Sequence, residues 1–216
     1  MNIAGAMTTL VRAGQVTMTM KAAPGRKTDH TPMLQSTITA VVLNPPWNIP
    51  QSIADKEVLP KARADPSYLE TEEIQVIDLP SGGQRLQQKA GAKSALGQVK
   101  FEFDNPFGVY LHDTPAKVAF DKTARLVSHG CVRLEKPKDL AVQLLQGQGD
   151  WNTQSLDTAI DTGDTTRVKI ERPMPVFLFY WTAYTGPDGR MIFYPDAYGW
   201  DQELLQKIAA KAPGRA

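Results

Sequence analysis

Short runs of β-branched residues, ended by proline or glycine, limit this chain to a fold built mainly from strands. Residues 36–43, Ser-Thr-Ile-Thr-Ala-Val-Val-Leu, predict a strand that the following Pro45-Pro46 pair ends. Residues 2–21 predict a hairpin around Ala13-Gly14, because polar and apolar residues alternate along its second half. The sequence therefore predicts a mostly β fold with a few helices, of the α+β class.

The remaining elements follow from the same patterns. Further strands are predicted at residues 99–103, 109–112, 168–170, 176–184 and 191–193, and helices at residues 136–146, 153–161 and 201–210. Pro187-Asp188-Gly189 predicts the turn before the last strand. Four aromatic residues are expected in the core of the sheet: Phe177, Phe179, Tyr180 and Trp181.

Residues 47–89 interrupt the strands with a different pattern. A short helix is predicted near residues 52–59, a turn near 65–69, a strand at 74–78 and another turn at 81–83. We interpret this segment as an inserted subdomain beside the functional site. Residues 1–46 and 90–216 then form one catalytic domain.

Length and charge exclude several classes of protein. A chain of 216 residues can bury one good core but hardly two full domains. The 24 Lys and Arg residues against 23 Asp and Glu leave a formal charge of +1 with no basic block, so nucleic acid is not an expected partner. No apolar run is long enough to span a membrane, and the first residues lack the regions of a secretory signal peptide.

One cysteine and a distant histidine carry the strongest chemical pattern. Cys131, the single cysteine, lies in Ser128-His129-Gly130-Cys131-Val132-Arg133, and His112 ends a predicted strand upstream. A cysteine attacks carbonyl carbon as its thiolate, so it needs a neighbour that accepts its proton. Cys131 is therefore the candidate nucleophile and His112 the candidate base. A buried core cysteine and a hydrogen-bonded core histidine are the plain structural alternatives.

The residues around Cys131 have expected roles that fit a reaction at its thiol. Gly130 lets the backbone approach a substrate, and the N–H groups of Gly130 and Cys131 are candidate donors to an oxyanion. Ser128 is expected to order the loop, and His129 to be a structural or substrate-contacting residue rather than the base. Arg133 is a candidate substrate contact, with a solvated surface charge as the alternative.

Two aromatic residues are weaker candidates for binding. Tyr110 shares the strand face of His112, and Trp47 opens the predicted insert, although ordinary packing would explain both. Zinc ligands of the right residue types are present in His112, His129 and Cys131, but no Cys-x-x-Cys or helical His pair supports a metal site. No metal or cofactor is therefore expected. His30 has no evident role.

His112, a spacer of fifteen residues and then the Ser-His-Gly-Cys motif resemble the L,D-transpeptidase catalytic domain of YkuD type. Residues 44–50, 95–101 and 175–183 are similar to the YcbB-like subgroup of that family. The resemblance implies a β-sandwich-like catalytic domain with an inserted capping subdomain at residues 47–89. It also implies that the backbone carbonyl of Asp113 orients His112, so that the Asp113 carboxylate is not needed.

The resemblance further implies an activity and its partners. Cys131 would be acylated at the third residue of a peptidoglycan tetrapeptide stem, with release of terminal D-alanine, and the acyl group would pass to an amine of another stem. Carbapenem β-lactams would acylate the same cysteine. The full-length protein would act in the periplasm or cell envelope, so we expect a targeting segment ahead of these residues.

Two other functions stay open at this stage. The first is an L,D-carboxypeptidase or another cysteine hydrolase, although a papain-like enzyme would place its cysteine before its histidine. The second is a catalytically silent wall-binding module, against which the intact histidine and cysteine argue.

Overall fold

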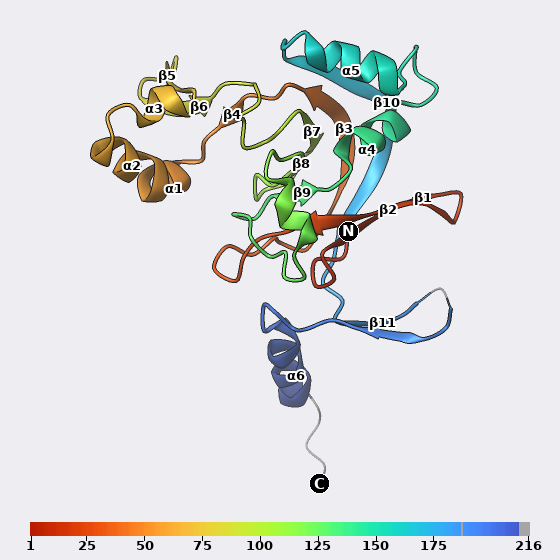
Figure 1. The fold of residues 1–216 in the computed structure, drawn as a ribbon. Helices are drawn as coiled ribbons and strands as arrows, with labels where there is room; N and C mark the ends of the chain where they lie inside the picture. The colour runs from red at the N-terminus through yellow and green to blue at the C-terminus, as the bar shows by residue number, and fades with distance from the viewer. Residues whose placement is uncertain (187, 212–216) are drawn as a thin grey trace.

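The predicted mostly β fold with a few helices is confirmed by the computed structural model, which describes residues 1–186 and 188–211. A seven-stranded sheet in the order β1-β2-β9-β8-β7-β3-β10 forms its centre (Figure 1). These strands are β1 (Met7–Arg12), β2 (Gln15–Ala23), β3 (Leu34–Leu43), β7 (Val99–Phe103), β8 (Leu111–His112), β9 (Val132–Leu134) and β10 (Thr166–Leu178).

The first hairpin lies where the sequence predicts it. β1 pairs antiparallel with β2, with Thr9 opposite Thr19. Ala13 and Gly14 both have positive φ angles, of 48° and 76°, as a tight turn between twisted strands requires.

One strand pair in the sheet is parallel. β8 pairs antiparallel with β7 but parallel with β9. The connection from β8 to β9 contains the 3-10 helix η2 (Lys117–Asp121) and the cysteine motif. The predicted strand 109–112 forms the ladder only at Leu111–His112, so the residues before it belong to a loop.

Two helices pack beside the sheet, at the upper right of Figure 1. α4 (Pro137–Leu145) contacts β10 and β7 and buries its apolar residues, and α5 (Thr153–Asp161) packs on α4. Asn152 caps α5 by accepting hydrogen bonds from the N–H groups of Gln154 and Ser155. Both helices agree with the sequence pattern.

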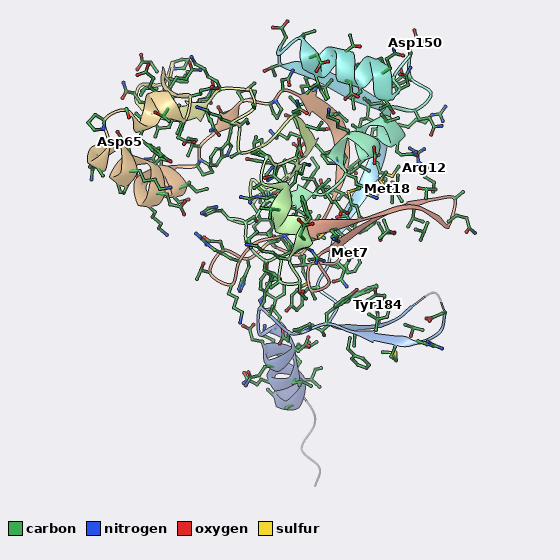
Figure 2. All side chains as sticks on the ribbon, in the orientation of Figure 1. Met7, Arg12, Met18, Asp65, Asp150 and Tyr184 are labelled. Atoms are coloured by element: carbon green, nitrogen blue, oxygen red, sulfur yellow. The ribbon has the colours of Figure 1, made fainter. Side chains whose placement is uncertain are left out.

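Residues 47–88 form a unit with its own sheet and its own apolar cluster. The elements are β4 (Trp47–Asn48), α1 (Gln51–Ile53), η1 (Ala54–Val58), α2 (Leu59–Ala64), α3 (Tyr68–Thr71), β5 (Ile74–Asp78) and β6 (Gln84–Gln88). The strands pair in the order β4-β6-β5. Figure 1 shows this unit, hereafter the insert, projecting from one side of the sheet, and Asp65 lies at its outer end (Figure 2).

The insert differs from its prediction in two ways. Its helical run extends from residue 51 to residue 64 and includes a five-residue π segment, η1, where a single short helix was predicted. The strand β6 was missed because Gln84-Arg-Leu-Gln-Gln has no β-branched residue to mark it.

The strands predicted at 168–170 and 176–184 are one strand, β10, which ends at Leu178. Its pairing with β3 lapses between Lys169 and Met174 and then resumes. β10 is an edge strand, where a residue without a backbone N–H, such as Pro173, is tolerated.

The prediction that Phe177 and Trp181 belong to the core is wrong. Phe177 is 49% exposed because it lies on the outer face of β10, and Trp181 is 55% exposed beyond its end. Tyr180 is buried as predicted, and Phe179 is half-buried.

The chain ends with a hairpin and a helix that extend from the sheet at the bottom of Figure 1. These elements are β11 (Ala183–Thr185), β12 (Met191–Phe193) and α6 (Trp200–Lys211). Pro187 of the predicted turn lies outside the described residues. Figure 2 places Tyr184 on the hairpin. Of the helices described, none is long and apolar enough to cross a membrane.

Candidate active site

The parallel pair β8 and β9 brings the predicted catalytic residues to one face of the sheet. His112 lies opposite Arg133, and Val132 donates its N–H to the carbonyl oxygen of Tyr110. Residues opposite each other on neighbouring strands share a face, and so do residues two apart on one strand. Tyr110, His112, Cys131 and Arg133 therefore lie on one side, and all four line a cleft of about 410 Å³.

The insert and several loops supply the other walls of this cleft. The first wall comes from the insert and consists of Trp47, Pro50, Ser52, Ile53, Lys56 and Glu57. A second comes from the loop after β2 and consists of Arg26, Thr28 and Asp29. The rest is made by Ala95, Leu96 and residues 107–109, together with Ser128 and His129 of the motif. The cleft thus lies between the insert and the central sheet.

Ser128 orders the loop that carries the thiol. Its hydroxyl donates to the carbonyl of Cys131 and accepts the N–H of Gly130 at 3.1 Å. The carbonyl of Gly130 accepts the hydroxyl of Thr31 at 2.7 Å, so both sides of the loop are fixed. Gly130 has φ +114°, which a residue with a side chain rarely adopts. Glycine is therefore required here by backbone conformation, since a Cβ would have ordinary contacts only.

The predicted pair of oxyanion donors needs one correction. The N–H of Gly130 is bonded to Ser128 and is not directed to a substrate. The N–H of Cys131 has no acceptor within hydrogen-bond distance among the residues the structure describes. Of the two candidates, Cys131 is thus the one whose N–H is available.

His112 is held by its neighbour's backbone. Its Nδ1 lies 2.5 Å from the carbonyl oxygen of Asp113, and a carbonyl only accepts, so Nδ1 carries the proton and Nε2 can accept one. The Asp113 carboxylate is engaged elsewhere, since it accepts the N–H of Gln98 at 2.9 Å and pairs with Lys117. The backbone of Asp113, rather than its side chain, therefore orients the imidazole.

Burial keeps both catalytic candidates uncharged near neutral pH. It lowers the pKa of His112 from 6.5 to about 4, with the charge of Arg133 as the next cause and the Asp113 carbonyl opposing. Burial also raises the pKa of the Cys131 thiol, an effect that hydrogen bonds from Tyr110 and the charges of Lys100 and Arg133 partly offset. The resting site therefore holds a neutral thiol and a neutral imidazole.

The lowered pKa of His112 predicts a specific dependence of stability on pH. Because the unfolded chain binds this proton at higher pH than the folded one, stability is fully present above pH 6.5 and is lost as the pH falls from there toward about 4. We expect the free energy of unfolding to fall by about 2 kcal/mol more between about pH 7 and about pH 5 in the native protein than in His112→Gln. Urea unfolding at the two pH values measures this difference.

An exposed residue without a titratable group provides the control for that measurement. Gln35→Ala should retain the pH dependence of the native protein. Equal losses in the native protein and in His112→Gln would show that His112 does not titrate between these pH values.

Tyr110 and Trp47 are neighbours in the cleft. The pKa of Tyr110 is raised well above 10, mainly by burial and next by the charge and hydrogen bond of Cys131. A hydrogen bond from Trp47 lowers this pKa. The Tyr110 ring meets the His112 ring edge-on, at 5.6 Å between centroids, and the Nζ of Lys100 lies 4.7 Å from the Tyr110 centroid. No sequence pattern marks Lys100, although it lies opposite His112 in the sheet.

Arg133 reaches the cleft without a carboxylate partner among the described residues. Its Nε is buried and has no hydrogen-bond partner in that part of the chain. Burial lowers its pKa, and the thiolate form of Cys131 would act in the opposite direction. A partly buried cation without a carboxylate partner is suited to an anionic ligand group.

His129 points to the insert rather than to the thiol. Its Nε2 lies 2.6 Å from Oε1 of Glu57, which sequence analysis did not single out. His30, for which no role was predicted, stacks on Tyr198 at 4.1 Å between ring centroids. Within residues 1–186 and 188–211, no group of three or more His, Cys, Asp or Glu side chains is placed to hold a metal ion.

A family model of the L,D-transpeptidase catalytic domain, YkuD, matches residues 1–170. The chain belongs to this family. It is also 34% identical over 209 residues to a Haemophilus influenzae protein that is provisionally named an L,D-transpeptidase. The match covers 89% of this chain and 42% of that relative, so the chain spans less than half of the relative's length.

Two solved structures of L,D-transpeptidases are similar at low identity. An enzyme from Mycobacterium smegmatis is 17% identical, with a TM-score of 0.36 over 82% of this chain and 55% of its own. LdtMt1 in complex with imipenem is 18% identical, with a TM-score of 0.34 over 82% of this chain and 56% of its own. Because both scores are below 0.5, the family assignment rests on the sequence matches.

Proposed function

We propose that this domain is a peptidoglycan L,D-transpeptidase in which Cys131 is the nucleophile and His112 its base. The observation that carries the proposal is the parallel pairing of β8 and β9, which places both side chains in one cleft. Membership of the family supports the reaction class. As an enzyme of peptidoglycan, the full-length protein would act in the periplasm or cell envelope.

The neutral state of the site fits a general-base mechanism. The Nε2 of His112 takes the thiol proton as Sγ attacks the carbonyl carbon of the third stem residue, and the N–H of Cys131 stabilises the resulting oxyanion. The bond to D-alanine then breaks, the His112 proton passes to the leaving amine, and a thioester remains. An amine of a second stem attacks this thioester, forms the cross-link and returns the thiol.

Other residues of the cleft would hold the donor stem. Arg133 is suited to a carboxylate of the peptide, and Tyr110 and Trp47 form an aromatic wall beside Cys131. We assign residues 47–89 as a capping subdomain on the catalytic domain of residues 1–46 and 90–216, as in the YcbB-like subgroup. The separate sheet and apolar cluster of the insert support this division.

Intact-mass analysis with a tetrapeptide stem, with and without an acceptor amine, tests the function. We expect an acyl adduct on Cys131 after loss of D-alanine, and a cross-linked product only when the amine is present. Imipenem should form one covalent adduct on the same cysteine. Thioester hydrolysis that an added amine does not divert would indicate a carboxypeptidase, and binding without an adduct would indicate a wall-binding module.

A further inference from the structure

The insert is bonded to the catalytic motif through one carboxylate. We propose that Glu57 is a positioning residue, which holds the insert against the motif loop by binding His129 and thereby keeps the substrate cleft closed on one side. This inference deepens the proposed function and rests on it. Neither the family match nor the motif assigns a role to Glu57.

The local structure explains how Glu57 reaches the motif. It lies in η1, the π segment in the middle of the helical run of residues 51–64. Ala54 and Val58 of this segment are buried in the apolar cluster of the insert, whereas Ile53 and Glu57 line the cleft. Single π turns inside helices are frequent at functional sites. The same short segment is therefore anchored in the insert and carries a carboxylate to the catalytic side.

The contacts of Glu57 join segments that are distant in sequence. Its Oε1 lies 2.6 Å from Nε2 of His129, 72 residues away, and 3.4 Å from Nη2 of Arg26. Arg26 is itself paired with Asp29. Among the described residues, Glu57 is the one residue of the run 51–64 whose side chain is hydrogen-bonded outside the insert. The hydrogen bond from His129 lowers the pKa of Glu57, which favours its charged form.

His129 connects this contact to the nucleophile. It lies between Ser128, whose hydroxyl fixes the carbonyl of Cys131, and Gly130, whose conformation turns the loop. The hydrogen bond between His129 and Glu57 therefore sets the distance between the insert wall and the thiol. Walls of this kind retain the substrate and exclude water. Loss of the Glu57–His129 hydrogen bond should therefore weaken substrate binding more than it slows the acylation step.

Kinetics of Cys131 acylation by imipenem, followed by intact mass, test the role of Glu57. In Glu57→Ala we expect the imipenem concentration for half-maximal acylation rate to rise at least about fivefold, with the limiting rate within about twofold of the native value. Iodoacetamide is a small reagent that does not depend on the insert wall for binding. Its rate of Cys131 alkylation should change by less than about twofold. His129→Ala should raise the same half-saturating concentration to the same extent. In the double variant this concentration should be no higher than in either single variant.

Two further variants separate positioning from folding. Glu70→Ala, an exposed residue of the same insert, should behave as the native protein. Glu57→Gln keeps the size of the side chain and an acceptor oxygen for His129. Its half-saturating imipenem concentration should therefore rise less than that of Glu57→Ala, and it replaces Glu57→Ala if that variant fails to fold. Absence of acylation in the native protein would overturn the proposed function together with this inference. Unchanged half-saturation in Glu57→Ala and Glu57→Gln, or additive losses in the double variant, would overturn this inference alone.

Discussion

Replacement of Cys131 by alanine is expected to reduce acylation by tetrapeptide stem or imipenem at least about 10³-fold, because no other thiol is present to form the thioester. The fold should be retained. Cys131 is only partly buried and lies before β9, so the lost sulfur contributes little packing. Intact mass reports the adduct, and a thermal unfolding curve reports the fold.

A residue outside the cleft makes this comparison sharper. Thr158→Ala changes an exposed side chain of α5 and should leave acylation unchanged. An adduct that persists in Cys131→Ala, or one that maps to another residue, would remove Cys131 from the role of nucleophile.

Replacement of His112 by alanine is expected to slow acylation about 10²- to 10⁴-fold near neutral pH, since the thiol would then lose its proton acceptor. In the native protein the acylation rate should fall on acidification near pH 4, because the pKa of the buried imidazole is lowered to about 4, rather than near pH 6.5. Above its pKa the imidazole is neutral and can accept the thiol proton. Rates of acylation by imipenem over a range of pH measure both effects.

His112→Gln controls for the loss of a buried polar side chain, because glutamine retains hydrogen-bonding groups but does not act as a base in this pH range. It should be as slow as His112→Ala while unfolding closer to the native temperature. A native acid limb at pH 6.5 or above would show that the resting site is not a neutral pair, and a glutamine variant with native rates would assign the base to another residue.

Residue types and short-range patterns were sufficient to predict much of the fold and the main candidates of the site. The helix at residues 153–161 and the turn at Ala13-Gly14 are local features, and the structure has both where the sequence predicts them. Cys131 and His112 could be chosen because few residue types carry nucleophilic chemistry. Their common face depends on the register between β8 and β9, which only the folded sheet defines.

The errors arise where tertiary structure decides. Val176 and Leu178 are buried and Phe177 is exposed, because alternation along β10 outweighs the hydrophobicity of the side chain. The Glu57 and His129 contact joins residues 72 positions apart, and neither has a local pattern that predicts the other. The sequence predicts an oxyanion role for the N–H of Gly130, because its hydrogen bond to the Ser128 hydroxyl cannot be inferred from residue types.

The position of the parallel pair has a consequence for the order of folding. β9 enters the sheet between β2 and β8, so the chain must be complete through residue 134 before the thiol has its place beside the imidazole. β8 contains two residues and β9 three, and this short pair is stable only between the longer strands β7 and β2. An unfinished chain would therefore carry a separated cysteine and histidine, and acylation would report complete assembly of the sheet.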